Sequence, residues 1–274
     1  MLSYRHAFHA GNHGDVLKHT ILAKTLDYLI QKDRPFMYVD THAGAGQYDL
    51  NHNVANKIND KATGVEKIWH EKVLPSLLQP YFNVLRKYNF NQKLHLYPGS
   101  SLIAQYFMRS HDRAVCYELH PNDYRKLVKT FIVDRRFQIL QKDGFKELCS
   151  HLPPKERRGL ILIDPSYEQI AEYKSVLISI KKAMRLFPTA IYIIWYPLLS
   201  NQCAMPLLRQ LTALSIPKTL RIELNVTDSN SGIGLLGSGL WIINPPWVLE
   251  EELKEGLPWL TQKLTVKIYG SILS

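Results

Sequence analysis

The sequence predicts an α/β domain built on a doubly wound, mostly parallel sheet that ends in an antiparallel hairpin. Short apolar segments alternate along the chain with longer segments of helical periodicity, which is the pattern of βαβ units. Acidic residues follow several of the apolar segments, at positions that would be the carboxyl ends of strands. The last two apolar segments are separated by a Gly-rich stretch instead of a helix, which favours an antiparallel pair. These features predict a Rossmann-like sheet with ligand-binding groups along one edge.

Length and charge set the broad class. The chain has 274 residues, of which 46% are hydrophobic, so it can bury a substantial core. We expect one domain over residues 1–274, with an insertion inside it. Lys and Arg number 34 against 24 Asp and Glu, which gives a formal charge of +10. This excess favours a polyanionic partner, either nucleic acid or an acidic membrane, although a merely basic soluble enzyme would also carry it.

Several classes of protein are disfavoured. Cys116, Cys149 and Cys203 are far apart and odd in number, so neither a disulfide framework nor a zinc site is indicated. A reducing, cytoplasmic location fits this usage. The N-terminus lacks the apolar core of a signal peptide, and no apolar run approaches the roughly 20 residues of a membrane helix. The charge therefore indicates nucleic acid as the partner, and no membrane.

The first elements are an irregular arm and a helix. Residues 1–13 are polar and contain His6, His9 and His13, but no carboxylate or Cys joins them at a ligand spacing, so we expect no metal. Apolar residues then recur at helical spacing from Asp15 to Ile30, which predicts a helix.

Next comes a buried strand that ends in a glycine turn. Residues 35–40 form a short apolar segment closed by Asp40, and Gly44 and Gly46 follow it. Glycines placed directly after a strand let backbone N–H groups approach a ligand closely. The G-x-G pattern alone is weak, but its position after a strand strengthens it.

Residues 50–93 interrupt the expected alternation. Polar residues are followed by two helical patterns separated by Pro75, which predicts a small helical insertion subdomain. Some of its cations could contact a phosphate backbone, although a solvated charged face is the ordinary role of such residues. These cations are Lys61, Lys67, Lys72, Arg86 and Lys87.

The alternation then resumes. Helices are expected from Gly99 to Phe107 and around residues 124–131, with a third near 171–187. The expected strands cover residues 114–117, 137–140, 159–163, 191–195, 220–226 and 240–243, and a C-terminal helix follows the last one.

The strand ends carry the chemistry. A carboxylate in the place of Glu118 suits the two hydroxyls of a ribose, as a nicotinamide or an S-adenosylmethionine enzyme requires. Asp143 suits an adenine amino group, and Gly144 suits close approach of the backbone. Asp164 and Pro165 end a strand that is apolar throughout, and Tyr167 follows two residues later. This turn has the parts to hold a flat base that carries an exocyclic amine.

Two other motifs resemble binding sites by their letters. Residues 232–237 match G-x-G-x-x-G, but they open a strand instead of a helix, so we interpret them as a hairpin loop. Residues 244–247 read Asn-Pro-Pro-Trp and match an amine-binding turn better than residues 164–167 do. They follow the final antiparallel strand, so we expect them to end it and start the last helix.

Together, many segments of the chain resemble the bacterial 23S ribosomal RNA adenine-N6 methyltransferase family that modifies adenine 2030. The segments that carry the resemblance are residues 3–6, 11–13, 15–19, 40–46, 97–100, 118–121, 143–145, 157–164, 195–197 and 244–247. The resemblance implies a class I S-adenosylmethionine-dependent methyltransferase fold with a helical insertion. It also implies S-adenosylmethionine as methyl donor and naked or early-assembly 23S rRNA as substrate. We expect a monomer.

The resemblance also assigns residues to the site. It implies Asp164 as the catalytic residue and Tyr4 as a substrate contact, with His6 and Lys18 nearby. It places the cofactor contacts at His19, His42, Ser100, Glu118, Asp143, Gly144 and Asp164.

One departure from the family pattern concerns the catalytic turn, where Ser166 replaces the second Pro of D-P-P-Y. Asp164 and the Pro165 carbonyl can each accept one N6 hydrogen, and Tyr167 can stack on the base. The third position contributes stiffness only, so we expect retained activity. The alternatives are a DNA adenine-N6 methyltransferase and a non-catalytic RNA-binding protein on the same fold, with a nicotinamide dehydrogenase a distant third.

Overall fold

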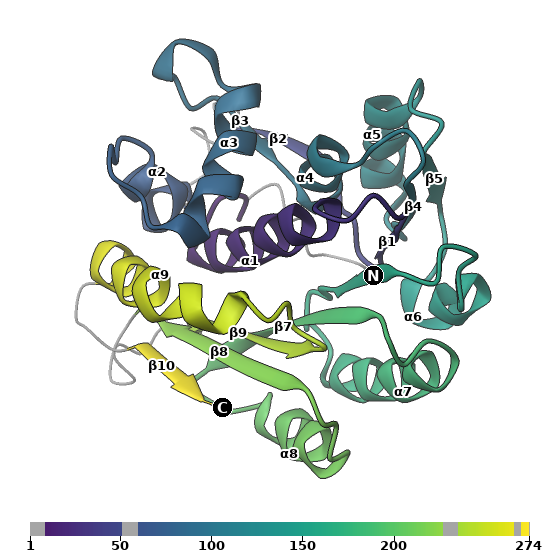
Figure 1. Cartoon of the computed structure of the whole chain (residues 1–274). Helices are drawn as coiled ribbons and strands as arrows, with labels where there is room; N and C mark the ends of the chain where they lie inside the picture. The colour runs from purple at the N-terminus through teal and green to yellow at the C-terminus, as the bar shows by residue number, and fades with distance from the viewer. Residues whose placement is uncertain (1–8, 51–59, 227–234, 266–269, 274) are drawn as a thin grey trace.

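The computed structural model describes residues 9–50, 60–226, 235–265 and 270–273 (Figure 1). Within these residues the main sheet has eight strands. From one edge to the other they are β10 (Gly270–Leu273), β8 (Thr219–Asn225), β9 (Leu235–Ile243), β7 (Ile191–Leu199), β6 (Gly159–Ile163), β1 (Met37–Asp40), β4 (Arg113–Tyr117) and β5 (Phe137–Leu140).

The sheet has a parallel part and an antiparallel part. Strands β7, β6, β1, β4 and β5 are parallel, so their carboxyl ends meet at one edge. Strand β9 lies antiparallel between β7 and β8, and β10 extends the antiparallel part. The predicted Rossmann-like sheet and its C-terminal antiparallel hairpin are thus confirmed.

Helices cover both faces of the sheet, as Figure 1 shows. They are α1 (His13–Ile30), α2 (Val65–Ile68), α3 (Gln79–Tyr88), α4 (Ser100–Phe107), α5 (Pro121–Phe131), α6 (Gly144–Glu147), α7 (Ile170–Leu186), α8 (Met205–Ala213) and α9 (Leu249–Leu264). Alternate residues of β6 belong to different cores: Leu160 and Leu162 pack with α1, α3, α4 and α9, whereas Ile161 and Ile163 pack with α7 and α8. Burial on both faces explains why this strand is apolar throughout.

Helix α1 begins two residues before the predicted start at Asp15. Asn12 is the N-cap, and its side chain accepts a hydrogen bond from the backbone N–H of Asp15. Asp15 therefore lies inside the first turn, where a carboxylate interacts favourably with the helix dipole. Most of the helix is buried, and its neighbours include α3, α4, α9 and β9. This burial includes Lys18 and His19, which lie deep in the molecule.

The segment at residues 50–93 contains α2, α3 and the 3-10 helices Asp60–Thr63, Ser76–Leu78 and Phe90–Gln92. A two-stranded antiparallel ribbon, β2 (Gln47–Asp49) and β3 (Leu96–Pro98), brackets the segment and was not predicted. The helical pattern expected before Pro75 gives only a short helix, since α2 ends at Ile68 and Val73 is 83% exposed. Leu77 and Leu78 pack into the same core as α1.

Other differences from the expected elements lie towards the C-terminal end. Helix α8 and strand β10 were not predicted, and β7 continues to Leu199 instead of ending at Trp195. The added length of β7 pairs with β9, where Tyr196 lies opposite Gly239. Helix α4 begins one residue after the expected start at Gly99, which is its N-cap and has no side chain to cap the helix.

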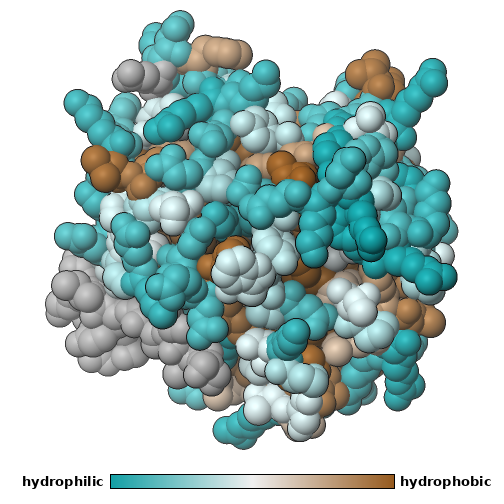
Figure 2. Space-filling model, in the orientation of Figure 1, coloured by the Kyte–Doolittle hydropathy of each residue, from teal (hydrophilic) through white to brown (hydrophobic). Residues whose placement is uncertain are grey.

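The visible face of the molecule is mostly hydrophilic, with apolar side chains in small separate groups (Figure 2). Within the described residues, no helix combines the length and the apolar character that a membrane span requires.

Candidate active site

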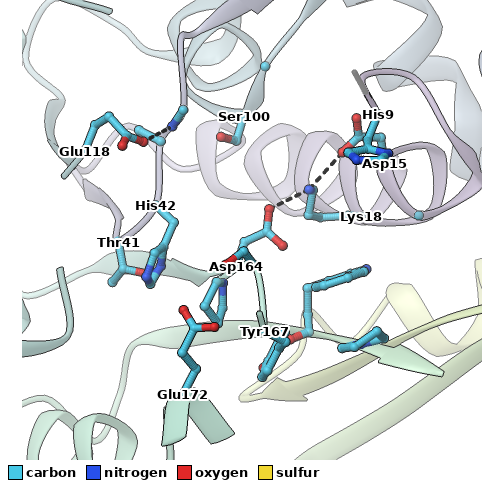
Figure 3. A pocket seen from close by; sticks show the side chains of 18 of the residues that line it. His9, Asp15, Lys18, Thr41, His42, Ser100, Glu118, Asp164, Tyr167 and Glu172 are labelled. Atoms are coloured by element: carbon cyan, nitrogen blue, oxygen red, sulfur yellow. Dashed lines mark hydrogen bonds and ion pairs between the residues drawn. The ribbon is translucent and has the colours of Figure 1, made fainter. Parts of the chain in front are cut away.

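A cavity of about 550 Å³ opens at the carboxyl ends of β1, β4, β6 and β7 (Figure 3). Most of the residues expected at the site line it. They are Lys18, His19, His42, Ser100, Glu118, Asp143, Asp164, Pro165 and Tyr167. Tyr4 and His6 lie outside the described residues. Gly144 does not line the cavity: a Cβ there would lie 2.1 Å from the carbonyl oxygen of Thr41, so close packing against that turn explains the glycine.

An ion-pair network lies at the centre of the cavity wall. The Lys18 ammonium is 2.5 Å from Oδ2 of Asp164 and 2.9 Å from Oδ1 of Asp15 (Figure 3). Burial lowers the pKa of Lys18, but Asp15 and then Asp164 outweigh it and raise that pKa above its usual value. Lys18 is therefore a permanent cation between two carboxylates. The side chain of Asp164 is 16% exposed, which leaves part of it open to the cavity.

The turn after Asp164 places an aromatic ring beside the cavity. Tyr167 has φ of 54°, in the left-handed region that non-glycine residues rarely adopt. Its hydroxyl donates to the carbonyl of Trp195 at 2.7 Å, and its ring lies 4.4 Å from that of Tyr173. Unfavourable backbone angles of this kind persist where surrounding contacts fix them, and they gather at functional sites.

The third residue of the turn is tied to the start of α7. Burial raises the pKa of Glu172, and hydrogen bonds from the Gln169 backbone and the Ser166 side chain oppose that rise. The Gln169 N–H donates to Oε2 of Glu172 at 3.2 Å, as part of a capping box. The Ser166 hydroxyl thus lies close enough to influence Glu172, and a proline would remove that influence.

Glu118 closes the glycine turn. Its Oε2 accepts from the Gly44 N–H at 2.8 Å, and its Oε1 accepts from the His120 N–H at 2.6 Å. Burial raises the pKa of Glu118 to about 7, while the His120 hydrogen bond opposes that rise. The residue thus brings the ends of β1 and β4 together at the cavity wall.

Asp40 ends β1, directly before the same turn, and is fully buried. Tyr38 donates to its Oδ2 at 2.8 Å and Ser100 donates to the same atom at 2.6 Å, while the His42 N–H donates to Oδ1 at 3.2 Å. Burial raises the pKa of Asp40 to about 6. Ser100 faces this carboxylate, so its hydroxyl is already committed within the protein.

Two histidines, His19 and His42, line the cavity. Burial lowers the pKa of His42 to about 4, so the ring is neutral at pH 7. It packs edge-on against Phe145, with ring centres 4.6 Å apart. His19 is hydrogen-bonded through Nδ1 to the hydroxyl of Tyr97 at 2.8 Å and stacks on that ring. Both rings suit contact with an uncharged planar or polar group.

Asp143 caps α6, where its Oδ1 accepts from the Phe145 N–H at 3.0 Å. Its side chain remains 30% exposed and lines the cavity. Its Oδ2 lies 3.4 Å from the exposed Lys146 ammonium, and the carboxylate can still accept a hydrogen bond from an amino group at the β5 side of the cavity.

The two motifs interpreted as decoys lie elsewhere. Asn244 follows β9, which runs antiparallel, and it donates to the carbonyls of Pro188 and Ala190, which precede β7. The Asn-Pro-Pro-Trp turn therefore lies at the opposite edge of the sheet, as its chain position predicts. Of the loop at residues 232–237, only residues 235–237 are described, and they lie in β9.

Several residues that line the cavity were not predicted as site residues. They are Asn12, Asp15, Ser166, Glu172 and Trp195, among others. Trp195 ends the predicted strand at residues 191–195, so its position on a parallel strand was the available signal. Asp15 was expected only to start a helix, and its ion pair depends on contacts that no local pattern reveals.

No group of three or more His, Cys, Asp or Glu side chains within the described part of the chain could hold a metal ion. The polar side chains around the cavity include carboxylates and histidine rings that come from several strand ends and from α1. This set suits the hydroxyls and amino groups of a nucleoside better than it suits a cation.

Known proteins resemble the chain over nearly its whole length. The profile of a family described as "Ribosomal RNA large subunit methyltransferase D, RlmJ" matches residues 33–273. A relative from Escherichia coli strain K12, "Ribosomal RNA large subunit methyltransferase J", is 45% identical over 264 residues, covering 96% of this chain and 94% of its own. A protein of the same name from Haemophilus influenzae is 43% identical over 272 residues, covering 99% and 97%. A crystal structure from Legionella pneumophila superposes with a TM-score of 0.89 at 40% identity, covering 97% of this chain and 98% of that one.

Proposed function

This chain belongs to the RlmJ family of large-subunit ribosomal RNA methyltransferases, and from that premise we propose how its cavity methylates adenine. The enzyme transfers a methyl group from S-adenosylmethionine to N6 of an adenine in 23S rRNA. When bound, S-adenosylmethionine supplies an electrophilic methyl group on a sulfonium centre. The roles of the individual residues are our proposal.

We propose that the adenosine part of the cofactor lies over the ends of β1, β4 and β5. Glu118 would accept hydrogen bonds from the ribose hydroxyls, and Asp143 would accept one from the adenine amino group. His19, His42 and Ser100 would line the remaining cofactor surface. The acceptors in the cavity fit these donors, and its volume of about 550 Å³ lies within the range of small-molecule sites.

Asp164 is the residue that we propose to act on the target amine. The lone pair of adenine N6 is delocalised into the ring, so the amine must be oriented before it can attack a methyl group. Asp164 and the Pro165 carbonyl would each accept one N6 hydrogen and direct the lone pair towards the methyl group. The Asp164 carboxylate would then take the proton that the methylated, cationic nitrogen releases.

The other substrate contacts surround this pair. Tyr167 would stack on the flipped base, an interaction worth about 1–3 kcal/mol. Lys18, which already contacts Asp164, and Tyr4 and His6 from the N-terminal arm would complete the substrate side. We further propose that the substrate is naked or early-assembly 23S rRNA, bound by a monomer in the cytoplasm.

The observation that carries this proposal is the position of Asp164, at the carboxyl end of β6 and open to the cavity. The test is transfer of labelled methyl groups to deproteinised large-subunit rRNA by the wild type and by Asp164→Asn. We expect the variant to lose nearly all transfer, because an amide is a poorer acceptor and cannot take the proton. Equal incorporation by the two proteins would remove Asp164 from the catalytic role.

A further inference from the structure

Asp15 connects two parts of the molecule through one buried carboxylate. Its Oδ2 accepts from the Gly11 N–H at 2.9 Å, and its Oδ1 lies 2.9 Å from the Lys18 ammonium. Gly11 has φ of 81°, and its carbonyl accepts from the Val65 N–H at 2.8 Å. The side chain of Asp15 is only 1% exposed, so these contacts are shielded from solvent.

The network restricts the reactive carboxylate more than a single ion pair would. Lys18 is held from one side by Asp15, three residues earlier on the same helix, and from the other by Asp164. A flexible lysine held by one partner could follow that partner through several rotamers, whereas one held at both sides cannot. The Lys18 ammonium contacts Oδ2 of Asp164, which leaves Oδ1 of that carboxylate available for a second hydrogen bond.

We propose that Asp15 is a positioning residue for methyl transfer. Acting through Lys18, it fixes the plane of the Asp164 carboxylate, so that Oδ2 stays on the ammonium and Oδ1 faces the target amine. Asp15 itself touches neither the base nor the methyl donor. This inference rests on the proposed function of Asp164.

The test compares Asp15→Asn with the wild type in methyl transfer to deproteinised 23S rRNA. Asparagine keeps the size of the side chain and an acceptor for the Gly11 N–H, but it removes the charge that holds Lys18. We expect kcat to fall by roughly 10- to 100-fold, the scale of a misplaced reacting group. We expect the KM and the Kd for S-adenosylmethionine to stay unchanged, because its ribose and adenine are proposed to bind at Glu118 and Asp143, at the ends of β4 and β5. A purely structural role would instead lower the thermal midpoint and weaken cofactor binding.

Two further variants make the test specific. Asp27→Asn removes the same charge from the same helix at a residue that does not line the cavity, and it should keep wild-type kcat. Adding Asp15→Asn to Lys18→Met should cause no further loss, because the link is already broken. A wild-type kcat in Asp15→Asn would overturn the inference. So would a double variant whose loss of kcat equals the product of the losses in the two single variants. An inactive wild type would instead contradict the proposed function.

Discussion

Glu118 is ionisable near neutral pH, and it lies where the ribose of the cofactor is proposed to bind. Burial raises its pKa from 4.5 to about 7 in the folded protein. Its ionised form is therefore disfavoured by folding, so this group lowers stability progressively as the pH rises from about 4.5 to 7. Ribose hydroxyls donate best to the ionised form, so cofactor binding and ionisation favour each other.

We therefore expect the affinity for S-adenosylmethionine to fall below pH 7. At pH 6 about one tenth of the Glu118 side chains would be ionised, against about nine tenths at pH 8. The affinity at pH 6 should therefore be roughly tenfold lower than at pH 8. Calorimetry between pH 6 and 8 measures this change. Glu118→Gln should bind weakly at every pH and with a smaller slope, because His42, whose pKa is about 4, stays neutral throughout, while the buried Asp40, whose pKa is about 6, still titrates at the acid end of this range. A wild-type slope retained by Glu118→Gln would assign the titration to another group.

Ser166 tests how much stiffness the catalytic turn requires. Ser166→Pro would reduce the chain entropy of the unfolded state by about 0.4–1 kcal/mol if the native angles suit proline. It would also remove the hydroxyl that helps to oppose the rise in the pKa of Glu172. These opposing effects predict little change in stability.

For the same variant we expect methyl transfer close to that of the wild type, because the proposed contacts come from Asp164, Pro165 and Tyr167. Urea unfolding and labelled methyl transfer measure the two outcomes. A rise from almost no activity to high activity in Ser166→Pro would show that the serine disables the turn.

The packing of β9 beside β7 leaves no room for a side chain at Gly239. A Cβ there would lie 2.2 Å from the ring of Tyr196, its partner across the two strands. The ring cannot shift easily, because its hydroxyl donates to Glu223 at 2.9 Å and accepts from Arg221 at 3.2 Å. The hairpin strand is thereby held against the strand that carries Trp195.

Gly239→Ala should therefore destabilise the protein by about 1–3 kcal/mol or more, as overpacked cores do. The midpoint of urea unfolding measures the loss. Ser238→Ala is a suitable control, since the neighbouring position already carries a buried Cβ and loses only its hydroxyl. Similar unfolding midpoints for Gly239→Ala and the wild type would show that the strands can separate slightly at this point.

How far the sequence predicts an element depends on the length and burial of that element. The strands at the centre of the sheet were predicted well, because burial on both faces requires an uninterrupted apolar run, as at Leu160 to Ile163. The ribbon of β2 and β3 was not predicted, because strands of three residues are too short to show an alternation of apolar and polar residues. The ends of parallel strands gathered Glu118, Asp143 and Asp164 as expected. The pairing of Lys18 with Asp164 joins residues 146 positions apart, and no local pattern specifies such a contact.

Two groups of exposed basic residues lie far apart along the chain: Lys155 and Arg157 form the first, just before β6, and Lys72 and Lys87 form the second, in the segment at residues 50–93. Arg157 and Arg158 precede β6 and so lie at its amino end, opposite the cavity. Arg158 donates to the carbonyls of Arg34 and Leu29, which gives it a structural role in holding the link between α1 and β1. The segment that contains α2 lies instead beside the start of α1, where Val65 bonds to Gly11.

We expect RNA binding to depend on the basic residues of the segment at residues 50–93 and not on those that precede β6. Lys72 and Lys87 are exposed in the segment at residues 50–93, whereas Lys155 and Arg157 are exposed at the amino edge. Lys72→Ala with Lys87→Ala should weaken RNA binding and flatten its salt dependence by up to about two phosphate contacts. Lys155→Ala with Arg157→Ala removes the same charge and should leave both unchanged. Titrations of deproteinised rRNA at several salt concentrations measure the slopes, and equal effects of the two pairs would contradict this division.

The burial of α1 also has a consequence for the order of synthesis. Lys18 leaves the ribosome early, but its partner Asp164 follows 146 residues later, and strand β9, which contacts α1, follows later still. At about 5–20 residues per second, the helix waits on the order of 10 s for the partners that bury it. During that interval α3 and α4, which follow earlier in the chain, can already pack on α1, whereas the surface that contacts β9 and α9 still waits to be covered. Methyl transfer therefore begins only after most of the chain has been made.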